Sequence, residues 1–247
     1  MLDAVGYLMD GMDRGNIGCL TTADTSKAFD SVQHRRLLEK LGWYGIDAHW
    51  FEDWLAGRRQ SVRGGSDTTL PITHGVIQGS LLGPILFLVF TNDLVSYLDG
   101  SKIVMYADDV QFLHQGLDSD MPELQATVER TVAAAHSWFD ENCLKINPNK
   151  TDLTVVKSTK RKSPSEFSIR FGDVTIRPSP MVKVLGMTVD GGLTFEAHVS
   201  SVVRRCYATL GGLSKMTGKL PEAVKKNDSR NAHLSPSFVL LYSMGRL

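Results

Sequence analysis

The sequence predicts an α+β fold in which an antiparallel sheet is backed by helices. Residues 103–113 contain two runs rich in β-branched and aromatic residues that meet at Asp108 and Asp109, which is the pattern of a β-hairpin. A second short β-prone run, residues 19–23, leads directly to another acid, Asp24. Apolar residues recur at helical spacing through residues 121–139, and this segment is the clearest amphipathic helix of the chain.

Composition restricts the class of protein. The chain has 247 residues and is 42% hydrophobic, enough for one large domain or two small ones. Its three cysteines are scattered, which argues against a disulfide framework or a zinc site and fits a reducing compartment. The longest apolar run, residues 85–90, is too short to span a bilayer, and no secretory signal opens the chain. We therefore expect an intracellular protein, nuclear or cytoplasmic, with no membrane partner.

Charge is distributed unevenly along the chain. The formal net charge is zero, yet residues 91–141 hold ten acids and two bases, whereas residues 142–247 hold seventeen bases and seven acids. An evenly mixed surface would be the ordinary outcome. This asymmetry favours an acidic metal centre beside a basic surface that meets polyanions.

The remaining elements follow from local patterns. Helices are predicted at 2–12, around Leu37–Leu41, at 46–55 with Trp50, Phe51, Trp54 and Leu55 partly buried, from the loop 74–80 to about Leu98, and at 193–213. Further strands are predicted as hairpins at 60–72 and 167–176, as strand material in 144–156, and as a single strand at 182–187. The stretch from Pro221 onward lacks periodicity, and we expect it to be frayed.

The acids define the candidate site. Asp24 and Asp108 are separated by 84 residues, yet each follows a short strand, and adjacent strands would bring them together. Carboxylates gathered in this way can hold two Mg²⁺ ions about 3.5–4 Å apart, which is the arrangement used for phosphoryl transfer. Without metal, Asp108 and Asp109 should raise one another's pKa by like-charge repulsion. The alternative is that Asp108 and Asp109 form an ordinary solvated turn.

Five segments in order carry a family resemblance. They are Asp24-Thr25-Ser26-Lys27-Ala28-Phe29-Asp30-Ser31-Val32, Gly75-Val76-Ile77-Gln78-Gly79-Ser80-Leu81-Leu82-Gly83-Pro84, Tyr106-Ala107-Asp108-Asp109, Trp138 with Leu144-Lys145-Ile146-Asn147 and Lys150-Thr151, and Val184-Leu185-Gly186-Met187. Together they resemble the motifs of the reverse transcriptases of non-LTR (LINE-type) retrotransposons. Each motif alone is weak, but the ordered set over roughly residues 1–200 is very specific. In two departures from the family pattern, Ile77 replaces a proline and Thr25 replaces an aliphatic residue.

The resemblance implies a role for each matching residue. Asp24 and Asp108 would hold two Mg²⁺ ions, which Mn²⁺ can replace, Asp109 would assist, and the Thr25 backbone carbonyl could also reach a metal. The other implied roles are triphosphate binding by Ser26, Lys27 and Ala28, exclusion of the ribose 2′-OH by Phe29, nucleotide and template contact by Gln78, general acid catalysis by Lys150, and primer grip by Leu185 and Gly186. The structural alternatives are a core aromatic for Phe29, a loop polar residue for Gln78 and a surface charge for Lys150.

The resemblance also implies an architecture and a reaction. Residues 1–190 would form a right-hand polymerase palm with partial fingers, and residues 191–247 the helical start of a thumb or connection segment. The reaction would be RNA-directed DNA synthesis, with an RNA template, a DNA primer and deoxynucleoside triphosphates as partners. Two alternatives are an inert remnant that binds RNA through its basic C-terminal half, and a palm-like nucleotide cyclase, which the match around Gln78 disfavours. Because the family's fingers and endonuclease would lie upstream, we expect this chain alone to polymerise poorly.

Overall fold

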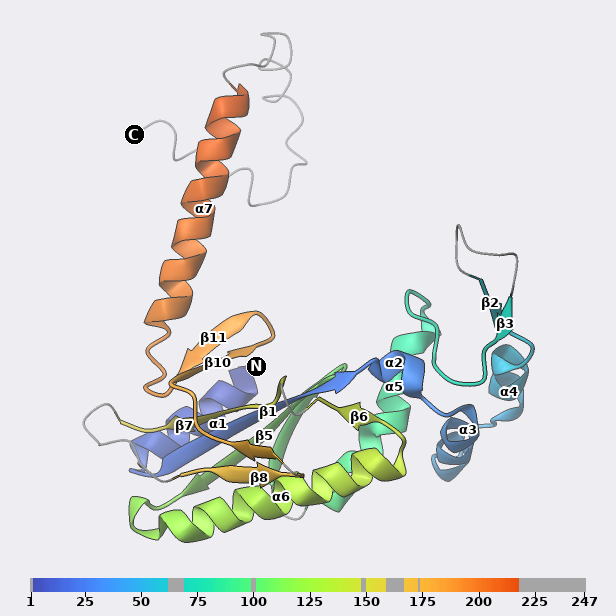
Figure 1. Ribbon diagram of the computed structural model, residues 1–247, viewed down its shortest axis with the longest axis horizontal. Coiled ribbons are helices and arrows are strands. Elements are labelled where there is room, and N and C mark those ends of the chain that lie inside the picture. Colours follow the sequence, from blue (N-terminus) through green and yellow to red (C-terminus); the bar gives the residue numbers. More distant parts are fainter. Residues whose placement is uncertain are drawn as a thin grey trace. The chain divides into compact units, whose positions relative to one another are not determined.

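The computed structural model describes residues 2–61, 69–98, 101–147, 150–158, 167–172 and 174–217. The chain divides into two compact units, Met1–Thr194 and Phe195–Leu247. The first unit contains the sheet and the helices that pack on it (Figure 1), and the second contains α7 (Glu196–Thr217). Among the described residues, no helix has the length and apolar character that crossing a membrane requires.

An antiparallel sheet forms the centre of the first unit. Its strands are β1 (Ile17–Ser26), β4 (Lys102–Tyr106), β5 (Asp109–Gly116), β6 (Lys145–Ile146) and β7 (Asp152–Val156). They lie in the order β4-β5-β1-β6, and β7 also pairs with β1. The long strand β1 is therefore central, and its pairing with β5 runs from Ile17 opposite Gly116 to Asp24 opposite Asp109.

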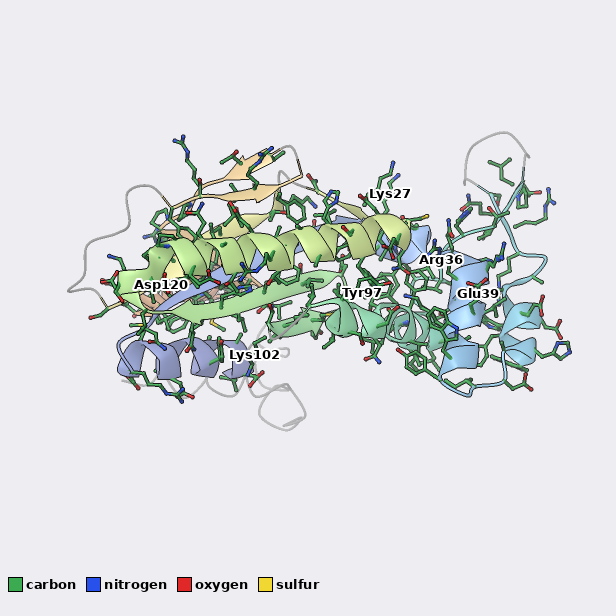
Figure 2. The ribbon with its side chains drawn as sticks, turned by 90° about the horizontal axis from the view of Figure 1, so that it is seen from below. Lys27, Arg36, Glu39, Tyr97, Lys102 and Asp120 are labelled. Atoms are coloured by element: carbon green, nitrogen blue, oxygen red, sulfur yellow. The ribbon has the colours of Figure 1, made fainter. Side chains whose placement is uncertain are left out.

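Helices cover both faces of this sheet. Figure 2 shows α6 (Met121–Glu141) on one side and α1 (Leu2–Asp13) on the other. The ammonium of Lys102, labelled beside α1, lies 2.9 Å from the carboxylate of Asp3. The side chain of Gln115 on β5 donates a hydrogen bond to the backbone carbonyl of Tyr7. These polar contacts fix α1 against β4 and β5.

The helix α6 joins two apolar cores. Its buried residues are Leu124, Val128, Thr131, Val132, Ala135, Trp138 and Phe139. Leu124, Val128 and Val132 pack in one core with strand residues such as Ile17 and Leu153. Ala135, Trp138 and Phe139 pack in the other core, together with residues of a group of shorter helices. The predicted amphipathic helix at 121–139 is therefore confirmed.

The shorter helices surround the second core. They are α2 (Ala28–Ser31), α3 (His34–Trp43), α4 (His49–Leu55), α5 (Leu82–Thr91) and the 3₁₀ helix η1 (Asn92–Tyr97). The helix predicted from the 74–80 loop to about Leu98 is confirmed, as α-helix to Thr91 and as 3₁₀ helix to Tyr97. One expectation needs correction. Trp50 is 56% exposed, because α4 buries Leu55 and turns Trp50 away from the core.

Three two-stranded hairpins and a second 3₁₀ helix complete the described part of the first unit. Their elements are β2 (Arg59–Gln60) with β3 (Leu70–Pro71), β8 (Ile169–Phe171) with β9 (Val174–Ile176), β10 (Met181–Val184) with β11 (Met187–Asp190), and η2 (Asp118–Asp120). The single strand predicted at 182–187 is wrong. Leu185 and Gly186 have φ of 48° and 80°, and positive φ at both central residues is the geometry of a tight hairpin turn.

Other predictions are confirmed with shifted boundaries. The helix at 2–12 is α1, the hairpin around Asp108 is β4–β5, and the hairpin at 167–176 is β8–β9. The helix expected at 193–213 forms from Glu196 to Thr217. The stretch from Pro221 onward lies outside the described residues. The result is a mixed structure of helices and antiparallel sheet.

Candidate active site

The pairing of β1 with β5 brings two of the predicted acids together. Asp24 ends the β1–β5 register directly opposite Asp109, the first residue of β5. Side chains directly opposite on antiparallel strands point to the same face, with Cβ atoms about 4.5–5.5 Å apart. Residues 85 positions apart in the sequence therefore become neighbours at one end of the sheet.

The turn before β5 adds Asp108. Because Tyr106 pairs with Asp109, only Ala107 and Asp108 form the turn, and Ala107 has a φ of 52°. Positive φ is unfavourable for a residue with a Cβ, so the surrounding pairing must hold this turn in place. The buried hydroxyl of Thr25 donates to the backbone carbonyl of Asp108 over 3.4 Å and ties the turn to β1.

Lys150 is held against Asp24 by both backbone and side chain. Its ammonium lies 2.6 Å from the Asp24 carboxylate. The backbone N–H of Asn147 donates to the Asp24 carbonyl over 3.1 Å, and the N–H of Lys150 donates to the Asn147 carbonyl over 2.9 Å. These two backbone bonds therefore hold Lys150 beside Asp24.

The negative charges of Asp24 and Asp108 disfavour ionisation of Asp109. The pKa of Asp109 is raised, first by partial burial and then by the charges of Asp108 and Asp24, while Lys150 opposes the shift. The predicted effect of Asp108 on Asp109 is confirmed in direction, although burial is the larger cause. The pKa of Lys150 is raised mainly by its hydrogen bond to Asp24. A positive charge beside these acids therefore stabilises their ionised carboxylates.

The chemistry of the donor oxygens suits a hard divalent cation. Carboxylate oxygens are the ligands that Mg²⁺ prefers, and one carboxylate of this group already bonds a cationic side chain. Within the described ranges, however, no three His, Cys, Asp or Glu side chains converge closely enough to hold a metal ion. The backbone thus brings Asp24, Asp108 and Asp109 to one end of the sheet, with the Lys150 ammonium on Asp24.

A second group of predicted residues forms where the 74–80 loop docks on α2. The N–H of Gly75 donates to the Val32 carbonyl over 2.7 Å, and the N–H of Val76 donates to the Phe29 carbonyl over 2.8 Å. A Cβ at Gly75 would lie 3.0 Å from the Asp30 backbone, and Gly75 has a φ of 91°. Both facts require glycine, so this position is explained by close backbone approach.

The next part of the loop forms a compact turn that begins α5. The Ser80 hydroxyl donates to the Ile77 carbonyl over 2.7 Å and accepts from the Gly83 N–H over 2.9 Å. A Cβ at Gly83 would lie 2.4 Å from the Ile77 carbonyl oxygen, so only glycine fits. The spacing of serine and glycine in this motif therefore follows from the geometry of one turn.

Lys27, Asp30, His74 and Gln78 line a cavity of about 600 Å³ on this side. The Gln78 amide donates to the Asp30 carboxylate over 3.3 Å. Lys27 adopts a left-handed backbone with φ of 52° at the start of α2. This cavity is lined by a different set of residues from the cavity beside Asp24 and Asp109, so the predicted site residues fall into two groups.

Phe29 has both a packing contact and an accessible side. Its ring stacks on Phe87, with centroids 4.5 Å apart and planes 21° apart, but the residue is only partly buried. Ala28, beside it, is buried. Ser26 ends β1, and the structure describes its backbone only.

Several site residues were missed from the sequence. A cavity of about 190 Å³ beside Asp24 and Asp109 is also lined by Gln111, Asp152 and Lys183. Gln111 is 1% exposed, and neither polar atom of its side chain has a partner in the described part of the chain. Strand alternation could have found it, because Gln111 lies two residues after Asp109 and so on the same face. Lys183 could not be found, because residues 182–187 were interpreted as one strand.

Lys183 and Val184 bring the β10–β11 hairpin to the acids. Both residues line the cavity that Asp24 and Asp109 share. The turn of this hairpin is formed by Leu185 and Gly186, and Leu185 is 38% exposed. The residues predicted as a primer grip therefore sit on a hairpin that borders the acidic end of the sheet.

Comparison with known families decides the class of protein. A family model described as reverse transcriptase (RNA-dependent DNA polymerase) matches residues 10–189. The chain belongs to the reverse transcriptase family. Members of this family generally use divalent metal ions, consistent with the carboxylate group at the end of β1 and β5.

Curated relatives of this reverse transcriptase segment come from non-LTR retrotransposons. The probable RNA-directed DNA polymerase from transposon BS of Drosophila melanogaster is 32% identical over 74% of this chain and 21% of that protein. The RNA-directed DNA polymerase from mobile element jockey of Drosophila melanogaster is 26% identical over 80% of this chain and 22% of that protein. The chain thus spans about a fifth of the length of these relatives. Among solved structures, apo telomerase from Candida tropicalis, truncated from its C-terminal domain, aligns with a TM-score of 0.49 and 14% identity over 78% of this chain and 38% of that chain.

Proposed function

We propose that this chain is the catalytic segment of an RNA-directed DNA polymerase, with residues 1–190 as its palm and partial fingers. Residues 191–247 would begin the thumb or a connection segment. The observation that carries the proposal is the register that sets Asp24 opposite Asp109, with Asp108 in the adjoining turn. The alternative of an inert RNA-binding remnant has no specific observation in its favour.

The carboxylates of Asp24, Asp108 and Asp109, with the Thr25 carbonyl, would hold two Mg²⁺ ions, for which Mn²⁺ is a substitute. Bound ions of this kind supply the charge that activates an attacking oxygen and steadies a leaving oxygen. The partners are an RNA template, a DNA primer and deoxynucleoside triphosphates. Because phosphoryl transfer needs mainly positioning and charge neutralisation, the acids require little further chemistry from the protein.

The remaining residues would position the substrates. The primer 3′-oxygen attacks the α-phosphorus, the bond from that phosphorus to the bridging oxygen breaks, and pyrophosphate leaves. Lys150, beside Asp24, can donate a proton towards the leaving pyrophosphate. The other proposed contacts are with the triphosphate for Ser26, Lys27 and Ala28, with the nucleotide and template for Gln78, and with the primer for Leu185 and Gly186.

Phe29 would select the sugar of the incoming nucleotide. It follows Asp24 by five residues, and its partly exposed ring rests on Phe87. Phe29→Val should relax exclusion of a ribose hydroxyl by about 10–200-fold, because pocket-sized steric differences are worth about 1–3 kcal/mol. The measurement is the ratio of ribonucleotide to deoxynucleotide incorporation. Phe29→Tyr is the matched control and should keep the exclusion, and an unchanged ratio in Phe29→Val would assign the ring to the core alone.

Primer extension tests the proposed function. Because the chain spans about a fifth of the length of its relatives, the test should use a polypeptide of the relatives' full length in which this chain replaces the matching segment. Extension on an RNA template with Mg²⁺ should be lost in Asp108→Asn, while the variant unfolds at a denaturant concentration close to that of the wild type. Extension by Asp108→Asn at a rate near wild type would contradict the assignment.

A further inference from the structure

The contact between Lys150 and Asp24 is unusual for an exposed ion pair. The N–O distance is 2.6 Å, and the Lys150 side chain is 61% exposed whereas Asp24 is 23% exposed. Exposed pairs are usually weak, because two mobile side chains must be held in one geometry. Here the backbone removes part of that cost, since the Asn147 N–H bonds the carbonyl of Asp24 itself.

The Lys150 ammonium is the counter-charge of the acidic group as a whole. The pKa of Lys150 is raised by its hydrogen bond and charge interaction with Asp24, and further by Asp108 and Asp109. Lys183, the other lysine that lines the same cavity, has no ion pair or hydrogen bond to these acids among the contacts of the described residues. Lys150 thus forms an ion pair with Asp24, while Lys183 lines the same cavity.

A divalent cation and this ammonium cannot share the same carboxylate oxygen. Mg²⁺ binds oxygen at about 2.0–2.1 Å in near-octahedral geometry. An ammonium 2.6 Å from Asp24 Oδ2 would lie within a few ångströms of such an ion, where two cations repel strongly. Because the lysine is the more exposed partner, it can move into solvent while Asp24 stays in place.

We propose that Lys150 is a built-in competitor of the divalent cation at Asp24, and that its displacement frees the ammonium to bind the polyphosphate of the incoming substrate. The nature of the cation and of the polyphosphate rests on the proposed function. Lys150 stays protonated during this exchange and changes only its partner, from the Asp24 carboxylate to the polyphosphate. The cation displaces the ammonium from Asp24, and the polyphosphate binds the displaced ammonium. Binding of either should therefore strengthen binding of the other.

Cation binding by the 247-residue chain, without nucleic acid, tests the competition. The probe is Mn²⁺, with free ion measured by electron paramagnetic resonance. Lys150→Met should bind Mn²⁺ about tenfold more tightly than wild type, because the competing ion pair and the repulsion between cations are both removed. Lys183→Met removes the same charge from the same cavity and should change affinity by about twofold or less, because its charge is screened and has no bond to Asp24.

Two further variants separate competition from general charge effects. Lys150→Arg keeps the cation and should not tighten Mn²⁺ binding. Asp24→Asn removes the contested carboxylate, so adding Lys150→Met to it should give no further tenfold gain. Equal tightening in Lys150→Met and Lys183→Met, or unchanged binding in Lys150→Met, would overturn the proposal. The assay involves no polymerisation, so its outcome is separate from that of the primer-extension test.

Discussion

Two lysine–aspartate pairs of almost equal length occupy very different places in this protein. Lys40 lies 2.7 Å from Asp93, and Lys150 lies 2.6 Å from Asp24. The side chain of Lys40 is 4% exposed, whereas that of Lys150 is 61% exposed. Distance alone would rank the two pairs together, so their difference lies in what surrounds them.

Lys40 belongs to the core. Its ammonium also donates to the Phe90 carbonyl over 2.7 Å, and it lies 4.5 Å from the Phe90 ring centroid and 4.8 Å from that of Trp138. Burial lowers the pKa of Lys40, and the bond to Asp93 opposes this shift. The side chain therefore joins α3 to η1, to the end of α5 and to α6, and the described residues offer it no other partner. Lys150, in contrast, can exchange its partner for water or for an anion.

Removing each lysine is the strongest test of this contrast. Lys40→Met should lower the free energy of unfolding by about 3–5 kcal/mol, because Asp93 and the Phe90 carbonyl lose a buried partner. Lys150→Met should change it by less than about 1 kcal/mol, as is usual for an exposed pair. Urea unfolding of the two variants measures both values. Similar losses in the two variants would mean that the exposed pair is also structural.

A pH titration should show how burial in the interior affects a titratable side chain. The His114 ring lies under α6, where its Nε2 is 2.9 Å from the Thr131 hydroxyl, and burial lowers its pKa to about 4 from 6.5. Between pH 6.5 and about 4 the unfolded chain binds a proton that the folded chain does not, so stability should fall as pH falls. The expected loss is about 3 kcal/mol over this range.

Replacing the ring identifies its contribution. In His114→Gln the decline between pH 6.5 and 4 should be shallower by about the amount assigned to His114. His136→Gln is a matched control, because that ring is only partly buried, beside Asp140 and Phe171, and its loss leaves His114 intact. An equally steep decline in His114→Gln would show that other groups cause the acid sensitivity.

The sequence predicted those features whose signals are local. Alternation predicted the hairpin around Asp108, and helical spacing predicted α1 and α6. The short strands predicted before Asp24 and before the Asp108–Asp109 pair indicated that adjacent strands would bring these acids together, and the register sets Asp24 opposite Asp109. By contrast, the β10–β11 turn at Leu185 and Gly186 has no Asn or Asp to mark it, so the hairpin was interpreted as one strand.

Other features depend on contacts between distant segments. Nothing near Lys40 in the sequence indicates that Asp93 and Trp138 will enclose it. The bond from Lys150 to Asp24 depends on the backbone bonds that join Lys150 to Asn147 and Asn147 to Asp24, and the resemblance implied only a role towards pyrophosphate. Position 83 must be glycine because a Cβ there would meet the Ile77 carbonyl oxygen. The motif contains this glycine, but the contact that requires it appears only in the structure.

The acidic end of the sheet is arranged for binding charge and not for stability. Asp109 is the residue at which this can be measured, because its pKa is raised by burial and by the charges of Asp108 and Asp24. A raised pKa in the folded state means that the ionised carboxylate destabilises the fold at neutral pH, and that this cost disappears below the ordinary value of 3.8.

The decisive measurement is the free energy of unfolding of Asp109→Asn at pH 7 in the presence of a chelator. We expect an increase of about 0.5–1 kcal/mol over wild type, the size usual for interactions between charges that are only partly buried. This gain should shrink as the pH approaches 3.8, where the wild-type carboxylate is itself protonated. A loss of more than about 1 kcal/mol at pH 7 would contradict the claim, because it would show that the fold depends on this carboxylate.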